Sequence, residues 1–506
     1  MTGRLVIALG MLLAQAPAAL TAEGRLNVLF IISDDLNNFL GCYGDPRAKT
    51  PNIDRLAARG VVFERAYCTF PLCAPSRNSM LTGLYPNSTG ILANQQIFRQ
   101  TIPGQISLPQ AFRRAGYFVG RIGKLYHYNV PSSIGTAGHD DPASWELQLN
   151  PAGCDRLEEE PHIFSLLPGR FGGTLSWYAS PKSDEHHTDG MIAEQAEWVL
   201  ERCARKKDRP FFLAVGFFRP HTPYVAPKKP YFDWYPEKEM PVVQGIKEDQ
   251  ADLPPAALGS HKKEQEKLTD DLRRQCVQAY YASISFMDAQ VGRVINALDR
   301  LGLADHTVVV FTSDHGYHLG EHGLWQKMSL FEESARVPLL IVAPGMSRKA
   351  VVKAPVSQVD LYPTLAELCG VKAPDNLQGQ SLVPMLKDPS FVGRGWALTQ
   401  VMRGGGMARA TVSTDVGSEG PRFFGYTLRT ARWRYTEWDE GRKGRELYDH
   451  DTDPKELRNL ALDAAYARTV EELSQQLRAA VKSSFPPSGQ RPELQPGTWP
   501  PTLVEP

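Results

Sequence analysis

Four apolar segments without polar alternation form the predicted framework of this chain. They are rich in Val, Ile, Leu and Phe, and they span Asn27–Ser33, Phe211–Phe217, Thr307–Thr312 and Pro338–Val342. Strands that are covered on both faces have this pattern, because neither face alternates with solvent. The segments therefore predict buried strands of a parallel or mixed sheet.

Helical patterns lie between these segments. Pro51–Gly60 and Leu108–Gly116 each end in glycine, which tolerates the left-handed backbone that follows many helices. Met191–Lys206 and Leu272–Leu301 are longer amphipathic segments. Strands that alternate with helices predict an α/β fold, with a large, mixed but mostly parallel sheet sandwiched between helices.

Two long stretches, Asn129–Asp189 and Val225–Thr269, interrupt the alternation. They are rich in Pro, Gly and charge and have little periodicity. We expect surface excursions, which often rim the active sites of α/β enzymes. The pair His186-His187 in the first stretch suggests a metal pair, but we interpret both residues as loop histidines.

The pattern changes again around residues 388–395. Phe423–Trp438 predicts antiparallel strands, and Val470–Lys482 predicts a terminal amphipathic helix. We therefore expect a signal peptide at 1–22, a main α/β domain at 23–388, a smaller C-terminal α+β subdomain at 389–485 and a Pro-rich tail at 486–506.

The first residues have the pattern of a secretory signal peptide. Arg4 supplies positive charge, Leu5–Leu13 form a short apolar core, and Ala18–Ala22 offer cleavage sites. The apolar core is too short to cross a bilayer, although an uncleaved anchor is the alternative. We expect a secreted or periplasmic protein with no membrane span in the mature chain.

Charge and cysteine content narrow the function classes. Lys and Arg number 56, as do Asp and Glu, so the net charge is zero. This balance argues against a broad basic surface for nucleic acid, but an anionic substrate needs only a few local cations. Seven cysteines are sparse and odd for an exported chain, so a disulfide scaffold is not implied and at least one thiol is left over.

Acidic residues follow two of the predicted strands. One strand leads into Asp34-Asp35 and another into Asp314-His315. Open α/β sheets place their sites at the carboxyl ends of strands, and adjacent carboxylates are costly without a cation. Oxygen ligands suit calcium or magnesium, while the imidazole keeps zinc or manganese open. The two motifs together predict a metal site; Asp34-Asp35 alone would fit helix capping and solvation equally well.

The leftover thiol has a specific candidate in Cys73-Ala74-Pro75-Ser76-Arg77. Pro75 suits a first helical turn, so Cys73 should lie at a helix N-terminus, where the helix dipole favours negative charge. Arg77 lies one turn further and can face the same point. An ordinary thiolate nucleophile or a buried structural thiol would also fit this pattern.

The pattern Cys73-x-Pro75-x-Arg77 resembles the site that sulfatases present for oxidation of the cysteine to formylglycine. The chain also resembles the sulfatase N-terminal core at Asn27–Asp35, Gly41–Asp45, Thr50–Asp54 and Leu81–Gly83. Within this family, which belongs to the alkaline phosphatase superfamily, it looks closest to iduronate-2-sulfatases. That resemblance is carried by Gly123–His127, Arg219–Pro223, Tyr280–Gly292, Thr312–Gly316, Leu319–Gly323, Trp325 and Lys327.

The resemblance implies an alkaline phosphatase-like fold and a role for each matched residue. A maturation enzyme would oxidise Cys73, and one calcium ion per chain would bind the oxygen at position 73 together with Asp34, Asp35, Asp314 and His315. Five further residues would hold the sulfate and move protons: Arg77, Lys124, His127, His221 and Lys327. His221 would protonate the leaving alcohol, and His127 would accept a proton from the nucleophile. Singly, these residues would fit a solvated strand end, a turn or a surface loop.

Three functions remain open from the sequence. The first is hydrolysis of a sulfate ester on a saccharide, for which the resemblance implies a 2-O-sulfated uronic acid; other sulfated polysaccharides are equally open. The second is hydrolysis of a phosphomonoester or phosphonate ester in the same superfamily. The third is an inert glycan-binding relative, which every filled catalytic position argues against.

Overall fold

The computed structural model describes residues 24–404 and 421–495. The expected signal peptide and the end of the Pro-rich tail lie outside these residues. Within the described ranges, no helix has both the length and the apolar character that crossing a membrane requires.

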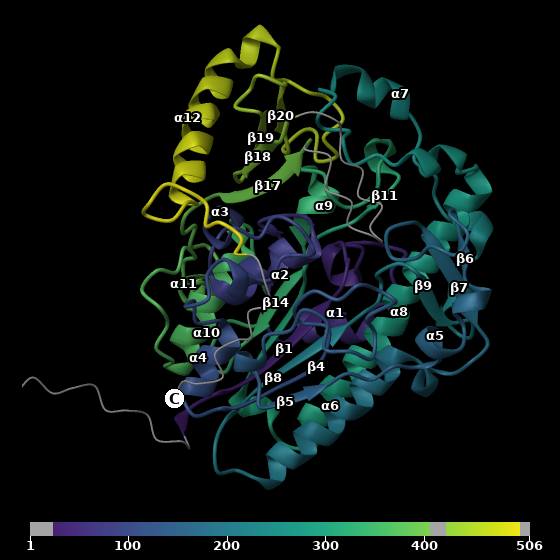
Figure 1. Ribbon diagram of the computed structural model, residues 1–506, viewed down its shortest axis with the longest axis vertical. Coiled ribbons are helices and arrows are strands. Elements are labelled where there is room, and N and C mark those ends of the chain that lie inside the picture. The colour runs from purple at the N-terminus through teal and green to yellow at the C-terminus, as the bar shows by residue number, and fades with distance from the viewer. Residues whose placement is uncertain (1–23, 405–420, 496–506) are drawn as a thin grey trace, which may run out of the picture.

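An 8-stranded mixed sheet forms the centre of the molecule (Figure 1). Its strands are, in spatial order, β15 (Ala350–Val352), β2 (Val61–Phe63), β14 (Leu339–Val342), β10 (Thr307–Ser313), β1 (Asn27–Ser33), β8 (Phe211–Phe217), β4 (Phe118–Gly123) and β5 (Leu147–Leu149). The run from β10 to β5 is parallel, whereas β14 is antiparallel to both of its neighbours. The predicted mixed, mostly parallel sheet is confirmed.

Helices cover both faces of this sheet, because successive residues of its central strands point to opposite sides. Leu29 and Ile31 pack with α1 (Pro51–Ala57), α6 (Thr188–Arg205) and α8 (Asp270–Arg300). On the other face, Val28, Phe30 and Ile32 pack with α2 (Cys73–Thr82), α4 (Leu108–Arg114), α10 (Leu361–Cys369) and α11 (Val383–Lys387). Two-sided burial explains why these strands show no polar alternation.

Shorter elements connect the layers. Four α-helices are only four residues long: α3 (Pro86–Thr89), α5 (Cys154–Leu157), α7 (Ile246–Asp249) and α9 (Glu332–Ala335). One small sheet pairs β11 (His318–Leu319) with β12 (Trp325–Gln326), and a second pairs β3 (Ala66–Tyr67) with β13 (Arg336–Val337) and β16 (Val356–Ser357). A third pairs β7 (Ser176–Ser180) with β6 (Phe164–Ser165) and β9 (Tyr224–Pro227). Several of them lie in residues 129–189 and 225–269. These excursions are therefore folded segments with buried residues such as Trp177 and Tyr235, not only the surface loops that we expected.

The C-terminal part folds as a four-stranded antiparallel sheet with a long helix across it. Its elements are β17 (Ala397–Arg403), β18 (Phe423–Arg429), β19 (Trp433–Trp438), β20 (Arg445–Asp449) and α12 (Ala467–Ser483). Gln400 donates to the Thr69 carbonyl oxygen at 2.9 Å, and Arg429 and Arg434 pair with Glu332. These contacts join the sheet to the main domain, so the boundary that we expect at residue 388 stays a prediction.

The described part of the Pro-rich tail is packed against the protein. Arg491 donates to Asn87 and Tyr426, at 2.7 and 2.8 Å, and its guanidinium lies over the ring of Phe424. Gln495 donates its backbone N–H to the Gln100 carbonyl oxygen at 3.0 Å. The Pro-rich composition of the tail does not indicate this packing, because these partners lie far away in the sequence.

Two glycines allow β4 and β8 to approach closely where both strands end. Gly123 and Gly216 are partners in the register, and the Lys124 N–H donates to the Gly216 carbonyl oxygen at 2.9 Å. A Cβ atom at Gly216 would lie 2.0 Å from the Lys124 carbonyl oxygen, a backbone atom that cannot move aside alone.

Gly216→Ala should therefore lower the free energy of unfolding by about 2 kcal/mol, because overpacking forces the backbone apart. Urea unfolding followed by circular dichroism measures this change. Gly120→Ala in the neighbouring strand β4 is the matched control, since its Cβ would meet neighbours only at 3.6 Å. Equal stability of the two variants would contradict the close approach.

Candidate active site

Parallel register brings the two predicted acidic motifs together. In the pairing of β1 with β10, Ser33 lies opposite Ser313, so Asp34-Asp35 and Asp314-His315 leave the sheet side by side. The Asp35 N–H donates to Asp314 Oδ1 at 3.1 Å. All four side chains are buried.

The neighbouring strands deliver the predicted basic residues to the same edge. Lys124 and His127 follow β4, and His221 follows β8. Lys327 lies just after β12, which belongs to a small sheet outside the central one. The site residues predicted from the sequence therefore converge on one region.

Cys73 is the first residue of α2, as the position of Pro75 predicted. Its Sγ atom lies 3.2 Å from Lys327 Nζ and 3.4 Å from His315 Nε2. Burial raises the pKa of Cys73, but Lys327, Lys124 and His315 outweigh burial and hold it well below that of an ordinary thiol. Position 73 thus favours a negatively charged group, in line with its place at a helix N-terminus.

Arg77 links the acidic motifs to each other. It is fully buried, with Nη2 2.8 Å from Asp34 Oδ1 and Nε 3.0 Å from Asp314 Oδ2. Its Nη1 donates to the Lys124 carbonyl oxygen at 2.9 Å. A planar guanidinium can hold three such partners in fixed directions, which a lysine cannot.

Two lysines complete the ion pairs. Lys124 Nζ lies 2.6 Å from Asp34 Oδ2, and Lys327 Nζ lies 2.7 Å from Asp35 Oδ1. Burial raises the pKa of Asp34, but Lys124, His221 and Arg77 hold it well below the usual value of a carboxyl group. Asp314 differs, because burial outweighs Arg77 and raises its pKa to about 6.

Backbone carbonyls fix the tautomers of two histidines. His315 Nδ1 lies 3.0 Å from the Gly316 carbonyl oxygen and His221 Nδ1 lies 2.5 Å from that of Thr222. A carbonyl only accepts, so Nδ1 carries the proton in both rings and Nε2 faces the site. His315 Nε2 lies 3.4 Å from both Asp35 Oδ1 and Asp314 Oδ2.

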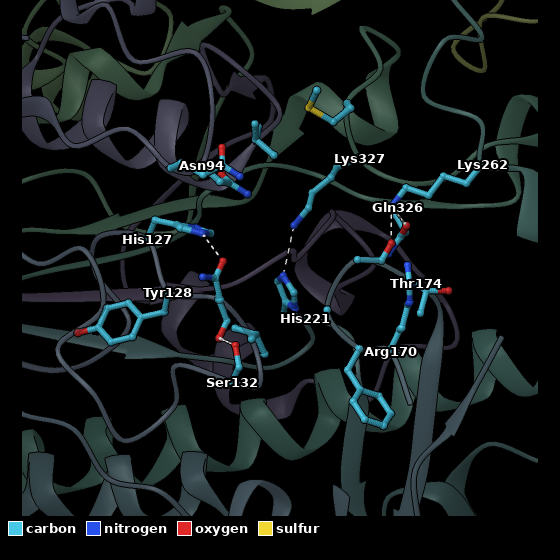
Figure 2. Close-up of a pocket in the computed structure, with 18 of the residues that line it drawn as sticks. Asn94, His127, Tyr128, Ser132, Arg170, Thr174, His221, Lys262, Gln326 and Lys327 are labelled. Atoms are coloured by element: carbon cyan, nitrogen blue, oxygen red, sulfur yellow. Dashed lines mark hydrogen bonds between the residues drawn. The ribbon is translucent and has the colours of Figure 1, made fainter. Parts of the chain in front are cut away.

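His127 has the opposite tautomer. Its Nε2 lies 3.1 Å from Asn129 Oδ1, an amide oxygen, so Nε2 is the donor (Figure 2). Nδ1 is buried and makes no hydrogen bond with the described residues. Burial lowers the pKa of His127, which keeps the ring neutral and Nδ1 available as a proton acceptor.

The site opens into a cavity of about 630 Å³. His127, His221 and Lys327 face this cavity, and Lys327 Nζ lies 3.4 Å from His221 Nε2 (Figure 2). Residues 129–132, 169–174 and 259–262 also line it. The expectation that the two excursions rim the site is therefore confirmed.

Comparisons with known proteins agree with this geometry. A family model described as Sulfatase matches residues 26–371. The chain is 34% identical to a sulfatase of Formosa agariphila, over 88% of this chain and 85% of that protein. It is 31% identical to the iduronate 2-sulfatase of Homo sapiens, over 92% and 97% of the two chains. This chain belongs to the sulfatase family.

A solved structure of an enzyme with a different activity is also similar to this chain. The structure of the phosphonate monoester hydrolase of Agrobacterium radiobacter matches this sulfatase with a TM-score of 0.74 and 25% sequence identity, over 91% of this chain and 96% of that one. Family membership makes the chain a sulfuric ester hydrolase. The phosphonate ester activity belongs to that protein.

The sequence does not reveal which residues hold the backbone of the site in place. Tyr280 of α8 donates to the Asp35 carbonyl oxygen at 2.8 Å and accepts from the Asn37 N–H at 3.0 Å. Asp35 has a φ of +62°, a left-handed conformation that a non-glycine residue adopts only when its surroundings hold it. Tyr280 lies in a helical pattern that predicts only core packing, so no local signal marks this role.

Tyr280→Phe should lower sulfatase turnover about 10-fold, because the Asp35 carbonyl and the Asn37 N–H would both lose a buried partner. The hydrolysis rate of an aryl sulfate measures this effect. Tyr281→Phe is the matched control, since that hydroxyl donates to Asp45 at 2.8 Å instead. Unchanged turnover in Tyr280→Phe would refute the positioning role.

Proposed function

We propose that this sulfatase hydrolyses sulfate esters of a carbohydrate, with a formylglycine made from Cys73 as the nucleophile and one calcium ion per chain. The observation that supports it most is the buried convergence of Lys327, Arg77 and the strand-end carboxylates around the N-terminus of α2. A formylglycine-generating maturation enzyme acts on the chain, and the segment 1–22 directs it to the periplasm or the cell exterior.

The donor set fits a hard divalent cation. The ligand atoms of Asp35, Cys73, Asp314 and His315 lie within 4.8 Å of one another. Asp35 Oδ2 is buried and accepts no hydrogen bond from the described residues. Carboxylate oxygens, together with those of Asp34 and of a modified residue 73, suit calcium. When bound, calcium supplies positive charge against the sulfate oxygens.

Position 73 is prepared for an oxyanion nucleophile rather than for a thiol. A hydrated formylglycine supplies one hydroxyl for attack on sulfur and a second whose deprotonation releases sulfate. Lys327 Nζ lies 3.2 Å from Cys73 Sγ, so its charge stabilises a negative charge at position 73. Arg77 and Lys124 stabilise the same region through their buried ion pairs.

Two histidines move protons in this proposal. His221 Nε2 faces the cavity beside Lys327 Nζ, and the imidazolium form of His221, with a proton on each ring nitrogen, donates the Nε2 proton to the leaving alcohol. His127, with its free Nδ1, accepts the proton from position 73. The hydrogen bond between His127 and Asn129 fixes the tautomer that this step needs.

Basic residues that line the cavity favour an anionic sugar, such as a 2-O-sulfated uronic acid, as the substrate. Arg170 and Lys262 lie on the side of the cavity that is away from His127 (Figure 2). Among the described residues, no ion pair or hydrogen bond engages the Arg170 guanidinium. A carboxylate on the same sugar ring as the sulfate would give this cation a bidentate partner. The similarity to an iduronate 2-sulfatase favours the same class.

Hydrolysis of a phosphonate ester is the second candidate, and the similarity to a phosphonate monoester hydrolase supports it. The same cations and metal ligands would serve either anion. The relative rates on two esters separate these candidates.

Peptide mass spectrometry of the active protein should find formylglycine at position 73, and Cys73→Ala should lose at least about 1000-fold in activity, because it removes the nucleophile. Aryl sulfate should be hydrolysed faster than the matching aryl phosphonate. Cys203→Ser, at a half-buried thiol on α6, is the control that keeps full activity. Active protein with only unmodified cysteine would overturn the nucleophile, and a faster phosphonate rate would overturn the sulfate ester as substrate.

Arg170→Ala should raise KM about 10-fold for a 2-O-sulfated uronate disaccharide, because a charged hydrogen bond to the carboxylate is lost. The variant should hydrolyse a small aryl sulfate normally. Arg156→Ala is the control, since Arg156 also lines the cavity but already pairs with Glu160 at 2.9 Å. An equal loss on both substrates in Arg170→Ala would exclude recognition of the carboxylate.

A further inference from the structure

A second group of metal-ligating side chains lies outside the sulfate site. Cys154 begins α5, Glu159 follows α5, and His187 immediately precedes α6. Their ligand atoms lie within 4.8 Å of one another. Their exposed fractions are 3%, 3% and 0%, so the group is closed to solvent. The pair His186-His187 suggested a metal pair that we interpreted as loop histidines, and nothing in the sequence joined His187 to Cys154 and Glu159.

The imidazole of His187 has unusual surroundings. Both ring nitrogens are buried, and neither makes a hydrogen bond with the described residues. The ring contacts Phe286 edge to face at 5.4 Å, which satisfies no nitrogen. A neutral imidazole has one N–H and one lone pair, and burying both without partners is costly. The lone pair of His187 is therefore available to bind a metal ion.

Glu159 is a buried carboxylate that no lysine or arginine of the described residues contacts as an ion pair. Its Oε1 atom accepts from Ser180 Oγ at 2.6 Å, and its Oε2 atom lies 3.6 Å from Cys154 Sγ. Among the described residues it has no ion-pair partner; the arginine in this region, Arg219, pairs with Asp155 instead. A buried charge of this kind needs compensation.

Two other groups contrast with this one. His322 with Glu333 and Glu456, and Glu332 with His450 and Glu456, also bring potential ligands together. Arg434 pairs with Glu332 and Glu456, and Asp249 pairs with His322 at 3.0 Å. These groups already have ion-pair partners within the protein. Among the described residues, Glu159 and His187 form no ion pair.

We propose that Cys154, Glu159 and His187 bind a zinc ion as three of its four tetrahedral ligands, with a water molecule that enters with the metal as the fourth. A thiolate, an imidazole and a carboxylate are the ligands that zinc prefers, and with one thiolate and one carboxylate the buried charges sum to zero. The 3.6 Å between Cys154 Sγ and Glu159 Oε2 is about the separation of two ligands on one tetrahedral ion. Zinc binding displaces the thiol proton of Cys154 to solvent.

The ion would brace the loop that carries His221. Asp155, the residue after Cys154, accepts from the Thr188 N–H at 2.8 Å and pairs with Arg219. Thr188 follows His187, and Arg219 lies two residues before His221. Zinc would therefore fasten α5 to the start of α6, and Asp155 would pass this support to the His221 loop.

Cobalt is the probe that tests the thiolate ligand. We expect metal-free full-length Cys73→Ser protein to develop a thiolate-to-cobalt charge-transfer band that saturates with one equivalent of sulfur-bound Co²⁺, because Cys73→Ser removes the other thiol that lies beside metal ligands. The band should disappear in Cys73→Ser/Cys154→Ser and weaken strongly in Cys73→Ser/His187→Gln. It should persist in Cys73→Ser/Cys203→Ser and in Cys73→Ser/Asp314→Asn, which isolates it from the sulfate site.

Zinc content and thermal stability provide the second measurement. The Cys73→Ser protein should retain about one zinc ion per chain after dialysis against buffer, and this zinc should raise Tm by several degrees through mass action. Cys73→Ser/Cys154→Ser should fold, as judged by circular dichroism, and show no zinc-dependent rise. A charge-transfer band or a Tm rise that survives Cys154→Ser, or the absence of retained zinc in the parent protein, would overturn the proposal.

Discussion

Balanced charge in a buried position is the constraint on which the rest of this structure depends. Three carboxylates, of Asp34, Asp35 and Asp314, are removed from water at the ends of β1 and β10. Three cations face them: Arg77, Lys124 and Lys327. Each group alone would carry a desolvation cost of several kcal/mol, which only short, well-directed pairs can offset. The site therefore exists only when strands, helix and loop are all in register.

The fold supplies that register through the backbone. β1 and β10 align Ser33 with Ser313, and the glycine pair at the ends of β4 and β8 lets the Lys124 carbonyl meet Arg77. Tyr280 holds Asp35 in its left-handed conformation from the adjacent helix layer. The charged side chains of the site are therefore held in fixed positions before a substrate binds.

The sequence predicted the parts of this arrangement that local patterns encode. Apolar strands without alternation, acidic residues at strand ends and a helix beginning at Cys73 were all visible in the chain. Strand β4 was missed because Arg121 and two glycines interrupt its apolar run. Arg121 is buried there and pairs with Asp140 at 2.6 Å, a compensation that no local pattern shows. The same reason explains why no local pattern indicated the roles of Tyr280 and Asn129 or the grouping of Cys154 and Glu159 with His187. Each of these depends on contacts that are distant in sequence or on burial.

The excursion between β4 and β8 has two physical tasks that constrain each other. Its surface residues line the cavity, where an exposed side chain such as Arg170 can change at little cost to stability. Its buried residues hold the loop of His221: Asp155 pairs with Arg219, and Asp189 accepts from the N–H groups of Phe218 and Arg219 at 2.9 and 3.0 Å. A change in those carboxylates would leave buried donors unpaired and would shift His221 as well. Substrate choice can therefore vary at the rim while the chemistry at the strand ends stays fixed.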